Sequence, residues 1–319
     1  MEYRQLGSSG VRVSVVGLGT NRFGTDKVPQ AEVNNIVDAA LALGINMIDT
    51  ADVYTGGRSE QTLGEALKGR WDKVVLATKF RSATGQGPND EGASRYYMLR
   101  AVEASLRRLQ SDHIDVYYVH RWDETTPIDE TLRALDDLVR VGKVRYVGAS
   151  NFLAWQVCRC NDLAARQGAE PFVTTQGHYN LLERELEREL IPFCRADGVG
   201  LLAYFALANG LLAGRYAPDA PPPPDSRAAV FERTQRYLNR YATADNYAAI
   251  GQLTEWAQAR GHTLSELAIA WVLAEPAVAT ALTGASSVAQ VVANARAAEW
   301  ALTADERRAV GDLAAAPPR

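Results

Sequence analysis

Four side chains with complementary acid–base chemistry follow apolar runs in the N-terminal half of the sequence. Asp49 closes a short apolar run, and Tyr54 comes shortly after it. Lys79 and His120 each directly follow a later apolar run. A phenol titrates near pH 10, so it is a weak acid at neutral pH unless a nearby cation lowers its pKa. The set therefore predicts a proton-donating site in which a lysine acts on a tyrosine.

The other three residues have defined parts in such a site. Lowering a phenol pKa by about 3 units needs roughly 4 kcal/mol of preferential stabilisation of the phenolate. One close ammonium in a poorly solvated pocket supplies that much. The carboxylate of Asp49 would keep Lys79 charged, and His120 would orient a carbonyl or relay a proton. Each residue alone also fits an ordinary structural role, but their joint placement favours catalysis.

Composition excludes several classes of protein. The 319 residues are 47% hydrophobic and 23% charged, which is enough for a large core. A net charge of −4 and a pI near 5.7 give no support for a nucleic-acid partner. No run of 18 apolar residues is present, and the N-terminus lacks the apolar segment of a signal peptide. Three cysteines without a CxxC spacing predict reduced thiols in a cytoplasmic protein and no metal site.

Apolar runs alternate with helical patterns along most of the chain. We expect strands at 13–18, 46–50, 74–78, 114–119, 144–148, 172–176, 200–204 and 280–282. We expect helices at 29–43, 59–68, 94–109, 128–141, 153–167, 183–196, 244–260, 264–275 and 287–300. Such alternation predicts a parallel sheet with helical crossovers. Eight units predict an α/β fold, a closed (β/α)₈ TIM barrel forming a single domain over 1–319, with functional residues at the C-terminal strand ends.

Two segments lie outside the repeat at the ends of the chain. Strands at 3–9 and 11–16 are expected to form an N-terminal β-hairpin. A C-terminal extra helix is expected at 301–316, with Thr303 as N-cap and Glu306 completing a capping box. The last three residues are expected to be frayed.

Anion binding has two candidate segments, because neither a GxGxxG nor a P-loop motif is present. The segment 283–288 leads from the last strand into a helix whose first amides would face an anion, and barrels commonly hold phosphate there. An ordinary N-cap explains it equally well. Arg215 and Arg227 flank four consecutive prolines and are able to clamp phosphates. The prolines favour an extended connection, and both a cofactor-covering lid and a surface insertion stay open for residues 216–244.

Six motifs occur in family order: NMIDTADVY, ATKF, YYVHRWD, VGASNF, QGHYNL and GASSVAQVVAN. With them the chain strongly resembles the aldo-keto reductase superfamily from residue 6 to about residue 313. The segment AYFALANGLLAGRY is most similar to a bacterial branch that holds inositol-cluster and general-stress reductases, and potassium-channel β subunits are more distant relatives. The resemblance implies a (β/α)₈ barrel that binds NADP(H) without a Rossmann fold and reduces aldehydes or ketones.

The resemblance also implies a role for each matching residue. Its catalytic set falls on Asp49, Tyr54, Lys79 and His120, with Tyr54 as general acid. The implied cofactor contacts are Thr20, Asn21 and Asp49 near the nicotinamide; Ser150, Asn151 and Gln176 at its carboxamide; Tyr204 against its ring; Leu207, Asn209, Gly210 and Arg215 along the pyrophosphate; and Gly284, Ser286, Gln290, Asn294 and Arg227 at the 2′-phosphate and adenine end. The implied substrate lining, which favours flat or aryl aldehydes, is Phe23, Tyr54, His120, Trp122 and Phe205.

Two departures from the family pattern affect these expectations. The family's YSPL is replaced by a segment in which Phe205 and Ala206 stand for the serine and the proline, so Phe205 would line or crowd the pocket. Ser286 is neutral where many relatives carry arginine or lysine. That weakens the preference for NADPH over NADH, although Arg215 and Arg227 would restore it. We expect NADP(H), with NAD(H) the less favoured cofactor.

Two other functions are compatible with parts of the sequence. One is a redox-sensing, NADP(H)-binding regulatory subunit with little catalysis, like the channel β subunits, although those resemble this pattern with asparagine in place of His120. The other is a barrel aldolase that uses Lys79 as a Schiff-base amine, against which Asp49 argues by keeping that lysine protonated. The expected partner is a small carbonyl substrate, and the sequence leaves open whether the chain forms a homo-oligomer.

Overall fold

The computed structural model describes residues 1–218, 220–224, 226–230 and 232–314. Its centre is a closed barrel of parallel strands in the order β10-β3-β4-β5-β6-β7-β8-β9. The predicted (β/α)₈ barrel is confirmed. The strands are β3 (Val16–Gly19), β4 (Met47–Asp49), β5 (Val75–Phe80), β6 (Ile114–Val119), β7 (Val144–Ser150), β8 (Phe172–His178), β9 (Gly200–Tyr204) and β10 (Val278–Gly284).

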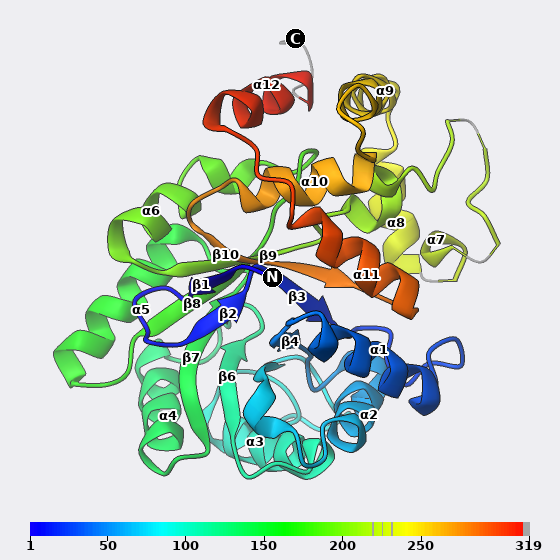
Figure 1. Ribbon diagram of the computed structural model, residues 1–319. Helices are drawn as coiled ribbons and strands as arrows, with labels where there is room; N and C mark the ends of the chain where they lie inside the picture. Colours follow the sequence, from blue (N-terminus) through cyan, green and yellow to red (C-terminus); the bar gives the residue numbers. More distant parts are fainter. Residues whose placement is uncertain (219, 225, 231, 315–319) are drawn as a thin grey trace.

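Helices surround the strands on all sides in Figure 1. Those within the strand–helix repeat are α1 (Gln30–Ala42), α2 (Arg58–Ala66), α3 (Arg95–Leu109), α4 (Ile128–Arg140), α5 (Ala154–Gln167), α6 (Leu190–Asp197), α10 (Leu264–Leu273) and α11 (Val288–Ala297). Helices α9 (Ala244–Gln258) and α12 (Ala304–Ala314) lie side by side at the outer edge of the molecule. Because both faces of the strands are covered, nearly every strand residue is buried.

Two apolar cores follow from the alternation of side chains along the strands. The larger one fills the layer between the barrel and its helices. The smaller one fills the barrel itself, with Met47, Val75, Val116 and Leu202 among its members. The N-terminal hairpin closes this inner core, since Leu6 is fully buried against it. The barrel is therefore a packed core, and in such barrels the functional side chains gather at the C-terminal end.

The hairpin is present, but its strands are shorter than predicted. They are β1 (Tyr3–Gln5) and β2 (Arg12–Ser14), because the chain already turns between Leu6 and Val11, where the Leu6 amide donates to the Val11 carbonyl at 3.0 Å. The predicted first barrel strand, 13–18, therefore begins later, at Val16.

One predicted helix is wrong in its first half. Residues 183–196 contain a short 3₁₀ turn, Glu185–Glu187, and α6 begins only at Leu190. Pro192 explains the break, because proline lacks an amide hydrogen and is accepted only in the first turn of a helix. A helix starting at residue 183 would have placed Pro192 in its interior.

The connection after Arg215 is also more ordered than the prolines suggested. It contains α7 (Arg227–Val230) and α8 (Glu232–Tyr241), and the sequence ERTQRYLNRY of α8 has no glycine or proline to interrupt a helix. At the C-terminus, α12 has the predicted capping box, with the Glu306 amide donating to Thr303 Oγ1 at 3.2 Å and the Thr303 amide to Glu306 Oε2 at 2.9 Å. The expected fraying of the last three residues lies outside the described residues. No helix in the described part of the chain is long and apolar enough to span a membrane.

Candidate active site

The alternation of side chains along the strands brings two site residues, Asp49 and Lys79, to the C-terminal end of the barrel. On β5, Val75 and Ala77 belong to the inner core, so Lys79 faces the same interior two residues further on. The same step leads along β4 from Met47 to Asp49. Lys79 lies inside β5, whereas the predicted strand 74–78 ends just before it. Asp49 and Lys79 therefore lie directly next to the inner apolar core.

A buried ion pair forms where these residues meet. Lys79 Nζ lies 2.8 and 2.7 Å from the two carboxylate oxygens of Asp49 and donates to the Thr50 carbonyl at 2.6 Å. The Tyr54 hydroxyl lies 3.4 Å from the same nitrogen. Burial lowers the pKa of Lys79, but the charge of Asp49 and its neighbour Tyr54 outweigh burial, so the pKa of Lys79 stands above its ordinary value. The lysine is therefore a fixed cation beside the phenol.

The position of Tyr54 depends on an unusual turn. Tyr54 begins a 3₁₀ segment in which Thr55, Gly56 and Gly57 all have positive φ, at 51, 67 and 88°. Glycine adopts this conformation without strain, and threonine does not. The His120 ring lies edge-on to the Tyr54 ring, with centroids 6.0 Å apart. The structure thus brings the four predicted catalytic residues together, and we call Asp49, Tyr54, Lys79 and His120 the tetrad.

Amide groups border the ion pair on the side of β7 and β8. Gln176 Nε2 donates to Asp49 Oδ1 at 2.5 Å. Asn151 Nδ2 donates to the His120 carbonyl at 3.0 Å, and its Oδ1 accepts the Tyr204 hydroxyl at 2.6 Å. Asn151 holds this position with a φ of 56°. The residues predicted to bind a nicotinamide therefore form one hydrogen-bonded group beside the tetrad, and Ser150 joins it by accepting from Asn151 Nδ2 at 3.0 Å.

Four of the predicted cofactor contacts lie just after β3 and at the start of α11. Thr20 is fully buried and donates to the Asp49 carbonyl at 2.9 Å, with Asn21 next in the chain. At the start of α11, Gln290 Oε1 accepts from the Ser286 amide at 2.8 Å and from its hydroxyl at 3.2 Å. The remaining predicted contacts occupy the 3₁₀ segment Ala208–Ala213 and its flanks, the end of β10, and α11: Leu207, Asn209, Gly210, Gly284 and Asn294. The side chain of Arg227 lies outside what the structure describes.

Sequence reasoning missed Arg22, which lies just beyond β3. Strand β10 pairs with both β3 and β9, so the loops carrying Arg22 and Arg215 flank the loop that leads into α11. Burial, and next the charge of Arg215, lower the pKa of Arg22. Its Nε is buried without a hydrogen-bond partner among the described residues. Two guanidinium groups close enough for the charge of one to lower the pKa of the other suit an anionic group. In the sequence, only the position of Arg22 just after the first barrel strand indicates that it belongs to the site.

The predicted substrate residues are placed differently from one another. Phe23 is fully buried in the outer core, so its side chain offers no surface to a substrate in this structure. Trp122 packs edge-on against Phe152, with centroids 5.2 Å apart. Phe205, with a φ of 59°, packs edge-on against His178 at 5.3 Å. Whether these three side chains line a substrate pocket stays a prediction.

Helix α8 supplies aromatic residues that sequence reasoning also missed. Tyr237 Oη lies 3.3 Å from His178 Nε2, and the His178 ring stacks on Tyr204 with centroids 5.5 Å apart. Asn180 Nδ2 lies 3.2 Å from the same histidine nitrogen. His178 is the last residue of β8 and lies two residues beyond Gln176, so α8 is joined directly to the end of the barrel that holds the tetrad.

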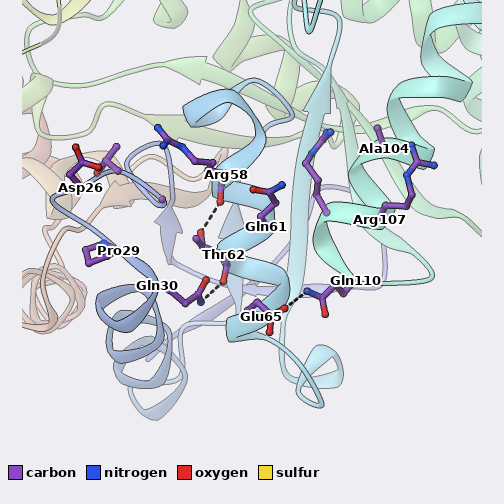
Figure 2. Close-up of a pocket in the computed structure, with 13 residues that line it drawn as sticks. Asp26, Pro29, Gln30, Arg58, Gln61, Thr62, Glu65, Ala104, Arg107 and Gln110 are labelled. Carbon is purple, nitrogen blue, oxygen red and sulfur yellow. Dashed lines mark hydrogen bonds between the residues drawn. The ribbon is translucent and has the colours of Figure 1, made fainter.

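A depression lies outside the barrel, over the exposed side of α2 (Figure 2). It has a volume of about 760 Å³ and is lined by charges of both signs, including Arg58, Glu65 and Arg107. None of its lining residues belongs to the tetrad. In the described part of the chain, no group of three or more His, Cys, Asp or Glu side chains is placed to hold a metal ion.

Residues 15–314 match the model of the Aldo/keto reductase family. The chain is 36% identical over 301 residues to a probable voltage-gated potassium channel subunit beta from Oryza sativa subsp. japonica, covering 93% of this chain and 91% of the relative. It is 36% identical over 330 residues to the uncharacterized oxidoreductase YrpG from Bacillus subtilis (strain 168), covering 99% and 97%. It is 36% identical over 306 residues to a versiconal hemiacetal acetate reductase from Aspergillus parasiticus, covering 86% of each.

Proposed function

Because the chain belongs to the aldo/keto reductase family, we propose that it is an NADP(H)-dependent oxidoreductase that reduces aldehyde and ketone carbonyls to alcohols, with Tyr54 as the proton donor. The observation that carries this proposal is the buried ammonium of Lys79, which lies 2.7 Å from Asp49 and 3.4 Å from the Tyr54 hydroxyl. A cation held in this way serves a phenol that must give up its proton near neutral pH.

The residues at the C-terminal end of the barrel fit a nicotinamide dinucleotide. Arg22 and Arg215 supply two neighbouring positive charges for its phosphates, and the buried Arg22 Nε still lacks a partner among the described residues. Ser150, Asn151 and Gln176 supply the hydroxyl and amides suited to a carboxamide. When bound, the cofactor supplies a hydride to the carbonyl carbon.

The side chains of the tetrad supply the proton. Tyr54 gives its hydroxyl proton to the carbonyl oxygen as that oxygen gains negative charge, and the phenolate left behind is stabilised by the ammonium of Lys79. Asp49 keeps this ammonium charged and fixed. His120, whose ring centroid lies 6.0 Å from that of Tyr54, orients the carbonyl oxygen toward the hydroxyl. The product is the corresponding alcohol.

Cofactor preference depends on the region that would hold the 2′-phosphate. Ser286 offers a neutral hydroxyl there, and Gln290 Oε1 already accepts hydrogen bonds from it. Arg22 and Arg215 lie on the two loops that flank the loop leading to Ser286. We propose a preference for NADPH over NADH that rests on these arginines, because each charged contact to a phosphate is worth more than a neutral one.

A second candidate function is a redox-sensing, NADP(H)-binding regulatory subunit with little catalysis. What favours it is the similarity to proteins described as channel β subunits in Oryza sativa and Arabidopsis thaliana. Against it stands the complete tetrad, which includes His120 next to Tyr54.

The test is the loss of reduced-cofactor absorbance with a nitrobenzaldehyde, comparing NADPH with NADH. Turnover with NADPH that saturates in aldehyde supports the reductase. Tight NADPH binding without turnover on any aldehyde or ketone of a broad panel favours the regulatory subunit. Absence of binding to either nucleotide contradicts both.

A further inference from the structure

A second group of buried polar side chains lies behind Lys79, in the layer between the barrel wall and helices α2 and α3. Glu60 is fully buried there and is well paired. Its Oε1 accepts from Thr78 Oγ1 at 2.6 Å, and its Oε2 accepts from Arg108 Nε at 2.7 Å. Thr78 and Lys79 are consecutive residues of β5 and face opposite sides of the wall. The paired carboxylate is thus adjacent to the tetrad.

Asp52 belongs to the same layer but has no such pairing. It is 3% exposed, and neither of its carboxylate oxygens has a hydrogen-bond partner among the described residues. It lies on the short turn that joins Asp49 to Tyr54, and its amide donates to the Lys79 carbonyl at 3.2 Å. An ionised carboxylate buried without hydrogen bonds is costly, whereas the neutral acid is much less so.

Burial and the neighbouring carboxylate of Glu60 favour the neutral form of Asp52 at neutral pH. Burial, and next the charge of Glu60, raise the pKa of Asp52 to about 8, against the opposing effects of Arg108, of the adjacent Val53 amide and of Lys79. Two phenols of the same layer complete its surroundings. Burial, with Asp52 among the nearby charges, raises the pKa of Tyr97 to about 12 and that of Tyr117 well above its ordinary range. Asp52 is therefore the group of this layer that changes charge between pH 7 and 9.

We propose that Asp52 is a positioning residue for the lysine–tyrosine pair, acting through Lys79 by being neutral when the enzyme works and charged only in alkaline solution. The inference rests on the proposed reductase function. While Asp52 is neutral, the groups that raise the pKa of Lys79 are Asp49 and Tyr54. Once Asp52 ionises, a further negative charge faces Lys79, stabilises the ammonium and makes the Tyr54 hydroxyl a weaker acid.

The retention of an unpaired buried carboxyl also has a cost in stability that can be measured without any enzyme assay. The folded-state pKa of Asp52 lies above its unfolded value of about 3.9. As pH rises from that value, the unfolded chain loses the proton first, so the wild-type protein loses stability until pH passes about 8. An asparagine at this position has nearly the same shape as aspartic acid and cannot ionise. The Asp52→Asn variant should therefore not lose this stability as pH rises.

The experiment compares wild type with Asp52→Asn in two measurements. In the first, melting temperature is followed from pH 5 to pH 9. We expect the melting temperature of Asp52→Asn to exceed that of wild type by an amount that grows with pH and reaches at least about 5 °C at pH 8.5. Above that pH the difference should stay constant. Tyr117→Phe is the matched control, because it removes a buried unpartnered hydroxyl from the same layer without changing the charge. Its shift in melting temperature should be the same at every pH.

The second measurement is the pH dependence of kcat for aldehyde reduction. The ratio of Asp52→Asn to wild type should be near 1 at pH 6 and should rise to roughly threefold at pH 9, because only the wild type gains the opposing charge. Asp52→Ser replaces the asparagine variant if that variant fails to fold. A kcat ratio that stays constant with pH overturns the inference while leaving the reductase intact. A wild type without turnover overturns the proposed function itself, and a constant melting-temperature difference shows that Asp52 is not protonated at neutral pH.

Discussion

Lys79 holds its charge because three oxygen atoms of Asp49 and Thr50 surround its tip within 2.8 Å. In water such contacts would exchange rapidly, but Lys79 is 1% exposed. Coulomb interactions are several times stronger at a buried site than in bulk water, so a single ammonium is sufficient to act on Tyr54. The acid–base chemistry of the site thus depends on burial as much as on residue type.

Replacing Arg22 by alanine tests the cofactor contacts at the residue scale. We expect the dissociation constant for NADPH to rise about 10-fold or more, since hydrogen bonds to a charged phosphate are each worth about 1.5–3 kcal/mol. The kcat for aldehyde reduction should change little, because Arg22 does not touch the tetrad. Fluorescence titration with NADPH gives the constant. Arg166→Ala, on the exposed face of α5 and paired with Asp162 at 2.8 Å, is the matched control. Equal affinities for the two variants would contradict the assignment.

The tetrad was predictable from sequence, whereas Arg22 and Asp52 were not. Asp49, Lys79 and His120 stand at strand ends, where side-chain alternation in a barrel leads to one common end. Arg22 lies in a loop whose path no periodicity describes. Asp52 sits only three residues after Asp49, and its burial depends on the turn that leads to Tyr54. Loop conformation is set by tertiary packing, which a single sequence does not display.

At the scale of elements, strands were located better than helix starts. The predicted strands 114–119 and 200–204 match β6 and β9 because each is a short apolar run with clear limits. The predicted helix 183–196 overlooked Pro192, and the proline-rich connection masked α8, whose Tyr237 packs on His178. A prediction from local composition alone overlooks the effect of a single proline on a helix start and the tertiary contacts that stabilise a helix such as α8.

Glu275 connects separate elements and predicts a measurable loss of stability. It is 1% exposed and accepts from Arg195 of α6 at 2.6 Å and from Arg307 of α12 at 2.9 Å. Glu275→Gln leaves Arg195 without a carboxylate and Arg307 with only the Glu187 carboxylate at 3.8 Å, so we expect the free energy of unfolding to fall by about 3 kcal/mol. Urea denaturation provides the value. Glu185→Gln breaks an exposed pair with Arg188 and should cost less than about 1 kcal/mol. A similar loss of stability in both variants would show that the buried Glu275 contributes no more than the exposed Glu185.

At the scale of the whole molecule, closure of the barrel makes each strand depend on its two neighbours. Strand β10 pairs with β3, so the first and last parts of the repeat are hydrogen-bonded to each other. The hairpin also joins distant segments, since Arg4 donates to the Leu273 and Val278 carbonyls at 2.8 Å. Residues from both ends of the chain therefore belong to one packed structure.

This closure leads us to predict that residues 1–319 unfold as a single domain. Thermal unfolding followed by far-UV circular dichroism and by tryptophan fluorescence should give the same midpoint, because neither half of the barrel can keep its core without the other. Calorimetric and van't Hoff enthalpies should also agree. Two separated transitions would show that the barrel contains independently folding parts.

The most direct test of the proposed mechanism is kcat for aldehyde reduction by Tyr54→Phe, measured together with NADPH affinity. The variant keeps the ring beside His120 and removes only the hydroxyl that lies 3.4 Å from Lys79. We predict that kcat falls at least about 100-fold while the NADPH dissociation constant stays within about twofold. Tyr96→Phe, which alters an exposed phenol on α3, should retain full activity. Full activity in Tyr54→Phe would show that the proton comes from another group.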